Sequence, residues 1–534
     1  MDEHGMALAA PWRDRARDEL ARGTFDLLVI GGGIIGAGIA NEASRAGLRV
    51  ALVDRGDFGG ATSSASSKLI HGGLRYLRLG DVRLVREAHR ERRALLRIVA
   101  PHLVRRLPFL FPVYEHGPYR RFTIQAALWT YSTLARDRLG GMVGPERARK
   151  SVPDLSLDGL RGCGVYADAW THDGRLCLAN VRAAALAGAT VLNYAEVDAL
   201  RVAGGRVSGA EVRDRIDGAE LAVAARTVVN ATGPWLDRVR RLEDAGAAPY
   251  GQLSKGVRVL LPLEHPWSAA LAIPQDKVRV TFAYPWEGML LLGTTDTPFD
   301  GNADDLAATT ADVETVLADA AVAVDAGLLR AERVISAFAG LRVLPLGRGG
   351  TVSARRETVF LRGKAGMLSV AGGKLTTYRQ IALDALETLA PELGLHRLDH
   401  RPVPLPGAAD ADMVSAVLAE RGVELDPRVR SQLAHLYGSL AGDVVAQAQG
   451  APELLEPLHP DAPEIGAQIA YAVREEWATS VEDLLQRRTT LALRGLATPE
   501  VVARVERLLM GALDPGGQVT SSPLASAPAR RAGG

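Results

Sequence analysis

The chain has 534 residues, of which 47% are hydrophobic and 23% are charged. This usage is ordinary for a folded protein of several domains and argues against a disordered, collagenous or membrane-spanning chain. The 63 basic and 62 acidic residues nearly cancel, so no global field attracts nucleic acid. With only Cys163 and Cys177, the chain has neither a disulfide framework nor four-ligand metal spacing, which indicates a reducing compartment and no metal site.

The first hundred residues predict a leader, a strand–helix–strand unit and a basic helix. Residues 1–22 mix acidic and basic side chains without a secretory apolar stretch, so we expect a flexible cytoplasmic leader. The apolar run 25–30 predicts a buried strand, and the glycines after it predict a tight turn into a helix that ends near Gly47. Residues 49–54 predict a second strand. Apolar side chains near helical spacing among arginines predict an amphipathic basic helix over 81–106.

Further along the chain, strand patterns give way to helical ones. Alternating apolar segments with Gly and Asp turns predict a strand-rich meander over 186–230 and a second strand-rich block over about 255–345. A helix is expected over 376–389, followed by a Pro-rich linker at 401–407. The patterns over 409–513 are helical and predict a separate domain.

A glycine motif follows the first predicted strand. Gly31-x-Gly33-x-x-Gly36 sits between that strand and its helix, and Asp54 ends the following strand. Gly31 permits the turn, Gly33 lets backbone approach a pyrophosphate, and Gly36 allows close packing of the helix. The helix N-terminus offers N–H groups to an anion, and Asp54 would accept from a ribose hydroxyl. The motif in this context predicts dinucleotide binding and leaves FAD and NAD open.

Six segments together resemble the FAD-dependent glycerol-3-phosphate dehydrogenases, a family of D-amino-acid-oxidase-like flavoproteins. The resemblance covers most of residues 24–510. The segments that carry it are GGGIIG at 31–36, TSSASSKLIHGGLRYL at 62–77, REAHRERRALLRIVAPHLV at 86–104, NATGPW at 230–235, PWEGMLLLGTTDT at 285–297 and GGKLTTYR at 372–379. A nicotinamide enzyme has no reason to combine the early fingerprint with the late GGKLTTYR segment, so the resemblance implies FAD.

The patterns and the resemblance together predict an α/β plus α fold. It has a Rossmann-like FAD-binding domain, a strand-rich substrate domain and a C-terminal all-helical domain. The expected boundaries are 24–105, 160–255 and 350–390 for the FAD-binding domain, 106–159 and 256–349 for the substrate domain, and 408–513 for the helical domain, with flexible tails at 1–22 and 515–534. The helical domain shows no chemical motif and could serve dimerisation or docking.

The resemblance implies that FAD contacts widely separated parts of the chain. Hydroxyls and a cation in the loop 62–68 suit an anion, although the residues alone equally suit a solvated Ser-rich turn. The implied cofactor-binding residues are Gly31, Gly33, Ile34, Ile35, Gly36, Asp54, Arg55, Thr62, Ser63, Ser64, Ser67, Lys68, Leu69, His71, Gly72, Gly73, Val197, Ala231, Thr232, Gly233, Gly373, Lys374, Leu375 and Thr376.

Substrate contacts are implied at the flavin end of the site. Arg342 stands alone in an apolar stretch, where a cation is costly unless an anion or a structural salt bridge meets it. The implied substrate-binding residues are Arg75, Tyr76, Arg258, Arg342, Lys374 and Thr377, and the implied catalytic residues are Arg342, Lys374 and His71. Such cations suit a phosphate ester, whose charge is about −1.5 to −2 at neutral pH.

One residue departs from the family pattern. Where the family has a histidine after Lys-Gly-[Ser/Val], this chain reads Lys-Gly-Val-Arg over 255–258. Oxidising an alcohol requires a proton acceptor, and arginine stays protonated in a protein, so Arg258 is no general base. His71 or water could accept the proton instead. Alternatively, Arg258 could bind a second anionic group, in which case the substrate differs.

The resemblance implies oxidation of sn-glycerol 3-phosphate to dihydroxyacetone phosphate, with a hydride passing from C2 to flavin N5 and electrons then passing to quinone. Three alternatives stay open: oxygen as acceptor in a glycerol-3-phosphate oxidase, a different hydroxy or amino acid as substrate, and a flavin-binding sensor without catalysis. The sensor alternative has one support in the sequence, the change at Arg258.

The resemblance also implies a cytoplasmic protein that is peripheral on the inner face of the cell membrane. The basic helix supplies Arg83, Arg86, Arg90, Arg92, Arg93 and Arg97 for such a surface. Glu87 and Glu91 among them favour a solvated face with pairs between neighbouring turns instead. We expect a homo-oligomer and no nucleic-acid partner.

Overall fold

The structure is a computed structural model that describes residues 11–73, 81–136, 140–345 and 358–513. Its helices are α1 (Pro11–Arg22), α2 (Ile34–Arg45), α4 (Val82–Ala94), α5 (Arg121–Ala135), α6 (Pro145–Ser151), α7 (Asp173–Leu186), α8 (Leu236–Glu243), α9 (Thr310–Ala320), α11 (Tyr378–Thr388), α12 (Ala390–Leu393), α13 (Ala411–Glu420), α14 (Pro427–Tyr437), α15 (Ala441–Ala446), α16 (Gly466–Glu475) and α17 (Pro499–Leu513).

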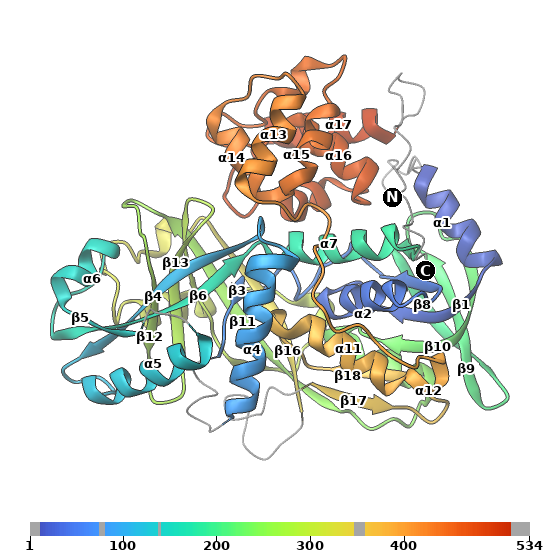
Figure 1. Ribbon diagram of the computed structural model, residues 1–534, viewed down its shortest axis with the longest axis horizontal. Helices are drawn as coiled ribbons and strands as arrows, with labels where there is room; N and C mark the ends of the chain where they lie inside the picture. The colour runs from blue at the N-terminus through green and yellow to red at the C-terminus, as the bar shows by residue number, and fades with distance from the viewer. Residues whose placement is uncertain (1–10, 74–80, 137–139, 346–357, 514–534) are drawn as a thin grey trace, which may run out of the picture.

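Its strands are β1 (Thr24–Ile30), β2 (Val50–Val53), β3 (Leu69–Ile70), β4 (Val104–Tyr114), β5 (Gly141–Val143), β6 (Leu160–Thr171), β7 (Thr190–Leu192), β8 (Ala195–Ala203), β9 (Arg206–Asp214), β10 (Glu220–Asn230), β11 (Gly251–Pro262), β12 (Ala270–Pro274), β13 (Val280–Trp286), β14 (Met289–Gly293), β15 (Thr297–Phe299), β16 (Ser336–Pro345), β17 (Val359–Arg362) and β18 (Leu368–Ala371). They form two sheets, and Figure 1 shows the helices α13 to α17 above both.

The first sheet has the order β17-β18-β10-β1-β2-β7, and β18, β10, β1, β2 and β7 run parallel. Successive side chains of β1 enter opposite cores. Leu27 and Val29 pack on the side of α2, α7 and α11, whereas Leu28 and Ile30 pack on the side of α1 and the antiparallel strands β8 and β9. Because both faces are covered, β1 reads as a continuous apolar run, as the sequence predicts.

The second sheet has the order β15-β11-β14-β13-β12-β4-β6-β3, with β16 added to β11 and β5 to β6. It takes up more of the chain than the predicted substrate domain. Strand β6 pairs with β4 over most of its length, and β3 pairs with β6. Residues 160–171 and 69–70 therefore lie in the second sheet, whereas the sequence places them in the FAD-binding domain, because pairing partners distant in sequence leave no local signal.

The predicted basic helix over 81–106 is shorter in the structure. Helix α4 ends at Ala94, a π-helical turn covers Leu95–Val99, and β4 already begins at Val104. From Leu107 to Val113, alternate side chains enter one core, which is the period of a strand. Arg92 and Glu91 are buried and pair with Asp168 and Arg379, so neither belongs to a solvated basic face.

The expected flexible leader is helical from Pro11 onward. The buried Arg13 guanidinium donates to both carboxylate oxygens of Asp214, at 3.0 and 2.6 Å, and to the Asn193 carbonyl at 2.9 Å. Leu20 on the same helix is fully buried. Residues 11–22 therefore pack against the rest of the protein, whereas the sequence predicts a flexible leader. The prediction was wrong because a mixture of charges does not reveal that Arg13 has a buried partner.

The C-terminal domain has two small cores of its own. The first gathers side chains of α13, α14, α15 and α16, and the second gathers those of α16 and α17. This agrees with the helical patterns predicted over 409–513. Among the described ranges, no helix combines the length and apolarity that a membrane span needs.

We expect the change Arg13→Met to undock α1. Removing the Arg13 guanidinium leaves the buried Asp214 carboxylate, among the described residues, with only Arg17 at 3.7 Å and the Ile216 amide at 2.8 Å, and breaking a buried pair costs about 3–5 kcal/mol. Amide hydrogen exchange across residues 11–22 should then rise by roughly a hundredfold or more, because exchange there reports local opening. The control is Arg22→Met on the same helix, whose pair with Asp18 is exposed and should contribute about 0–1 kcal/mol. Equal exchange in the two variants would contradict this account.

Candidate functional site

A cavity of about 460 Å³ opens at the carboxyl ends of the parallel strands. Gly31 follows β1, Asp54 follows β2, Ala231 follows β10 and Gly372 follows β18, and all four line it. In open parallel sheets this edge is where ligands bind, because the loops there diverge and the helix N-termini face the crevice.

The cavity brings together most of the predicted cofactor residues. Those that line it are Gly31, Gly33, Ile34, Ile35, Asp54, Arg55, Thr62, Ser63, Val197, Ala231, Thr232, Gly233, Gly373, Lys374 and Leu375, together with Arg342. They come from segments as distant as residues 31 and 375 but meet because strands β1, β2, β10 and β18 end side by side.

The glycine turn has the geometry that the motif predicts. Gly31 has φ +103°, and a Cβ there would lie 2.7 Å from the Ala231 carbonyl oxygen. A Cβ at Gly36 would lie 1.8 Å from the Gly31 carbonyl oxygen, so α2 can begin here only with glycine at that position. The Ile34 amide donates to Ser63 Oγ at 2.8 Å, which ties the Ser-rich loop to the start of α2.

Asp54 is held at the cavity by two backbone donors. The amides of Gly32 and Gly56 donate to its carboxylate oxygens at 2.6 and 2.8 Å. Burial nevertheless raises the pKa of Asp54 to about 6, because the loss of water outweighs these two donors. A ligand hydroxyl that donates to this carboxylate would favour its charged form.

Lys68 occupies a different place from the expected one. Its buried ammonium donates to Asp173 Oδ1 at 2.6 Å and to the Ser64 carbonyl at 2.8 Å. The same Asp173 carboxylate accepts from the amide and hydroxyl of Ser66, at 3.1 and 2.7 Å. Lys68 and Asp173 thus anchor the end of the Ser-rich loop behind the cavity, at the start of α7.

Arg342 lies on β16, opposite Ser254 of β11. Its guanidinium donates to Thr294 Oγ1 at 3.0 Å and to the Thr295 carbonyl at 3.3 Å, and Asp296 lies 3.9 Å away. These contacts orient the guanidinium at the cavity wall. The sequence left open whether a structural salt bridge meets Arg342, and Asp296 is such a partner. Lys374 lies at the same wall, in the turn before α11.

Arg258 is buried and turned toward the Ser-rich loop. Its Nη1 donates to the Ala65 and Gly256 carbonyls at 2.9 and 2.8 Å, and its Nη2 donates to Ser67 Oγ at 3.0 Å. The guanidinium therefore holds residues 65–67 against β11. This is a positioning role, whereas the sequence suggested a site for a second anionic group.

The His71–Gly73 segment lies behind the cavity, beside the turn that carries Lys374. The His71 amide donates to Thr376 Oγ1 at 3.1 Å. The Gly72 amide donates to the buried Asp168, and a Cβ at Gly72 would meet the His89 ring at 2.2 Å. The predicted residues Ser64, Ser67, Leu69 and Thr377 also lie outside the cavity lining. Arg75 and Tyr76 lie outside the described residues.

The cavity wall contains residues that the sequence reasoning missed. They are Tyr194, Arg215, Trp235, Arg238, Glu482 and Arg487. Trp235 stacks against Arg55, whose guanidinium lies 4.2 Å from the ring centroid. Glu482 and Arg487 belong to the C-terminal domain, and no local pattern connects them with the glycine motif more than 440 residues earlier.

The two cysteines differ in position, because Cys177 Sγ donates to the Gly32 carbonyl of the glycine turn at 3.4 Å. Cys163 and Cys177 are buried, and burial raises the pKa of the Cys163 thiol to about 12 and that of Cys177 well above its usual value. Protonated thiols of this kind are unreactive. Within the described ranges, no group of three His, Cys, Asp or Glu side chains could hold a metal ion.

Comparison with known families covers nearly the whole chain. A family described as FAD dependent oxidoreductase matches residues 26–379, and one described as the C-terminal domain of alpha-glycerophosphate oxidase matches residues 400–514. A glycerol-3-phosphate dehydrogenase of Mycobacterium leprae is 37% identical over 525 residues, which are 95% of this chain and 88% of that protein. One of Synechocystis is 34% identical over 504 residues, which are 89% and 90%.

Solved structures agree with this assignment. The glycerol-3-phosphate dehydrogenase of Bacillus halodurans, complexed with FAD, has a TM-score of 0.74 at 29% identity and covers 96% of this chain and 100% of its own. An L-alpha-glycerophosphate oxidase of Mycoplasma pneumoniae shares the fold at a TM-score of 0.55 and 17% identity, over 72% of this chain and 99% of that one. The chain belongs to the FAD-dependent oxidoreductases and, within them, to the family of the glycerol-3-phosphate dehydrogenases.

Proposed function

We propose that the protein oxidises sn-glycerol 3-phosphate to dihydroxyacetone phosphate. The relatives that match over most of the chain carry the name of this activity. The observation that supports it most directly is the meeting of Arg342 and Lys374 at one cavity wall with the glycine turn. Two cations at the carboxyl edge of a parallel sheet suit a small phosphate ester beside a dinucleotide.

The residues of the cavity fit FAD. The glycine turn lets backbone approach a pyrophosphate, the first amides of α2 face the cavity, and Asp54 can accept from a ribose hydroxyl. When bound, FAD supplies a ring that accepts a hydride from a carbon atom, here C2 of the substrate. Arg342 and Lys374 would then orient the substrate and stabilise the negative charge on its oxygens.

His71 is our candidate for the group that accepts the hydroxyl proton. The residue is half-buried and lies next to the cavity lining, where its backbone amide donates to Thr376 Oγ1 in the turn of Lys374. Arg258 is always charged and holds the loop 65–67, so its presence in place of the family histidine is compatible with turnover.

Anaerobic titration of the purified flavoprotein with glycerol 3-phosphate tests the proposed reaction. We expect the absorbance of oxidised flavin to bleach, with one dihydroxyacetone phosphate formed for each flavin reduced. Flavin that stays oxidised with this substrate, but bleaches with another hydroxy or amino acid, would refute the substrate. A protein that binds flavin and oxidises nothing would support the sensor alternative.

The change Arg342→Gln should weaken substrate binding without releasing flavin. Losing one charge-assisted contact to an oxygen of the substrate costs about 1.5–3 kcal/mol, which corresponds to roughly 10- to 150-fold in kcat/KM. Stopped-flow reduction measures this effect. The matched control is Arg279→Gln, which removes a half-exposed arginine of the same sheet that pairs with Asp319 away from the cavity. An unchanged kcat/KM in the Arg342 variant would contradict the assignment.

FAD affinity should fall as the pH falls through about 6. The Asp54 carboxylate, whose pKa is about 6 in the cofactor-free protein, must lose its proton to accept fully from ribose. Proton binding therefore competes with FAD below this pH, and the Kd should rise by up to about tenfold per pH unit. Equilibrium dialysis measures this slope. The change Asp54→Asn should remove the slope, and a slope that persists would assign it to another group.

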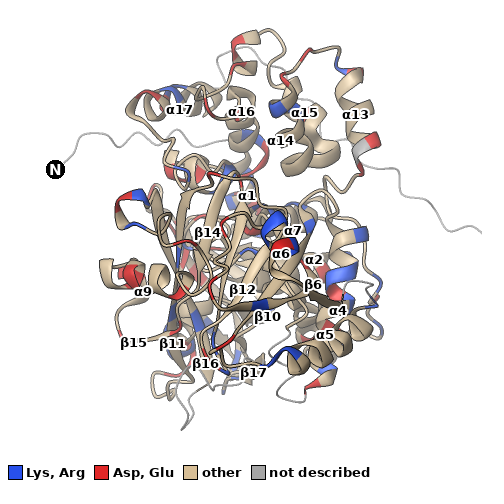
Figure 2. Cartoon of the chain, turned by 90° about the vertical axis from the view of Figure 1, so that its left-hand side faces the viewer, with Lys and Arg blue, Asp and Glu red and all other residues tan. Residues whose placement is uncertain are grey.

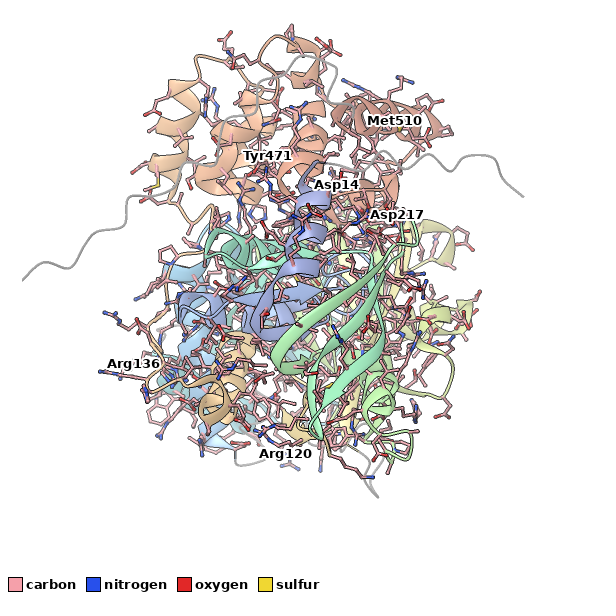
Figure 3. The ribbon with its side chains drawn as sticks, turned by 90° about the vertical axis from the view of Figure 1, so that its right-hand side faces the viewer. Asp14, Arg120, Arg136, Asp217, Tyr471 and Met510 are labelled. Carbon is pink, nitrogen blue, oxygen red and sulfur yellow. The ribbon has the colours of Figure 1, made fainter. Side chains whose placement is uncertain are left out.

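We further propose that electrons pass to a membrane quinone and that the protein acts at the inner face of the cell membrane. The exposed face of α5 supports this. Phe122 and Trp129 lie two turns apart on it, with 81% and 69% of their surface exposed. Arg120 precedes α5 and Arg136 follows it, and Figure 3 shows both in the lower half of the molecule, away from Met510 of the C-terminal domain.

Basic side chains of α4 extend this face. Arg83, Arg86 and Arg90 are exposed, and together with Arg136 they line a second hollow between α4, α5 and α11. Figure 2 shows the blue segments of α4 next to α5. Aromatic side chains beside arginines suit the boundary of an anionic bilayer, where the rings enter the interface and the cations meet lipid phosphates.

Replacing Phe122 and Trp129 with serine should weaken binding to vesicles that contain anionic lipid. Burying an aromatic side chain contributes about 1.5–3 kcal/mol, so we expect a loss of at least tenfold in flotation assays at low salt. Met510→Ser removes an apolar side chain on α17 that is 50% exposed and should have no effect. Binding that the double variant retains, or that Met510→Ser also loses, would refute this surface.

Homo-oligomer formation stays a prediction. The C-terminal helical domain is the part that we expect to mediate it, and light scattering of the full chain provides the test. A monomer at all concentrations would remove this role.

A further inference from the structure

A buried carboxylate joins the cofactor loop to the C-terminal domain. Asp57 lies in the cavity lining and is 3% exposed. Arg488 donates to its two oxygens at 2.6 and 2.8 Å, and Arg487 donates to one of them at 2.5 Å. Asn193 adds a fourth donor at 3.3 Å. All of these side chains are buried, so protein donors replace the water that would solvate the carboxylate in the unfolded chain.

The two arginines reach this carboxylate from a rare backbone conformation. Residues Asp483–Arg488 form a single π-helical turn, of the kind that is frequent at functional sites. Arg487 also donates to Asp483 at 2.6 Å, and Arg488 donates to the Glu476 carbonyl at 2.6 Å. Both guanidiniums are therefore oriented from their own domain before they meet Asp57.

Aromatic contacts hold the same loop from both sides. A Cβ at Gly32 would lie 2.4 Å from the Phe58 ring, so Phe58 packs directly on the glycine turn. The other side of Phe58 meets Trp477 of the C-terminal domain, with the ring centroids 5.6 Å apart. The Gly59 amide donates to the Gly32 carbonyl at 3.0 Å. Residues 57–59, at the centre of the loop 54–63, are thus buried between the glycine turn and the C-terminal domain.

The segment beside this loop is bonded to the same π-helical turn. The Tyr194 amide donates to the Gly56 carbonyl at 2.9 Å. Tyr194 lines the cavity, and its hydroxyl donates to Asp483 at 2.6 Å. Burial by itself would raise the pKa of Asp57, but Arg488 and Arg487 outweigh it and hold that pKa below its usual value. The cluster is therefore ionised, and removing an arginine leaves a buried anion without its counter-charge.

We propose that the C-terminal domain is part of the FAD site, with Arg488 and Arg487 positioning Asp57 and, through it, the loop 54–63 that carries cofactor-binding residues. FAD binding and docking of the C-terminal domain are then coupled, each favouring the other. The inference rests on FAD as the cofactor and is independent of the substrate, the acceptor and the membrane.

Hydrogen exchange of the wild-type protein tests the coupling without any mutation. By reciprocity, adding FAD to the apoprotein should slow amide exchange in residues 477–488, which line the cavity only through Glu482 and Arg487. A typical coupling predicts slowing by roughly 5- to 150-fold. Exchange there that does not change while residues 31–63 become protected would overturn the proposal.

Two matched variants separate positioning from general loosening of the interface. Arg488 lies outside the cavity lining, so Arg488→Gln leaves the direct contacts in place and should raise the Kd of FAD by roughly 5- to 150-fold. Arg182→Gln removes another ion pair of the same interface, Arg182 with Glu475 at 3.3 Å, which contacts neither the loop nor Arg488. It should change the Kd by less than about threefold if the loop is what matters.

The readout is flavin binding, measured by quenching of flavin fluorescence and by visible circular dichroism, so it does not depend on turnover. Arg488→Lys, which keeps the charge but loses the fork of donors, should recover part of the affinity. Equal losses in the Gln variants at 488 and 182 would reduce Arg488 to a structural residue. An unchanged Kd in Arg488→Gln would overturn the proposal directly.

Discussion

Close packing of the first turn of α2 onto the end of β1 is the constraint on which the site depends. With 1.8 Å between a hypothetical Cβ at Gly36 and the Gly31 oxygen, any larger residue would push the helix away from the sheet. Once the helix begins there, its amides face the carboxyl edge, where β2, β10 and β18 also end. The strands then deliver Asp54, Ala231 and the turn before Lys374 to one cavity.

Buried charges hold the loops around this edge. Lys68 with Asp173 anchors one end of the Ser-rich loop, and Arg258 binds its backbone from β11. Asp57, in the loop 54–63, binds Arg488 of the C-terminal domain. A buried ion pair contributes little net stability compared with apolar packing, but breaking it is costly, so such pairs define one arrangement of the loops.

The fold and much of the site were predictable because the signals are local. Periodicity identified β1 and the helical C-terminal domain, and the glycine motif located the start of α2 and its partner Asp54. Local signals misled where a charged or apolar residue had a distant partner. Arg13 in the expected leader meets Asp214, and the end of the expected basic helix is a strand because its partner is β6.

The sequence by itself determined the cofactor family and the glycine turn of the site, since glycine spacing and the segments around it are properties of consecutive residues. Only the tertiary structure decided which partners the buried lysine and arginine side chains bind. Lys68 and Arg258 donate to the Ser-rich loop, and Arg487 reaches the cavity from the far end of the chain. The physical reason is that a buried charge takes the partner that packing brings to it, and that partner can be hundreds of residues away.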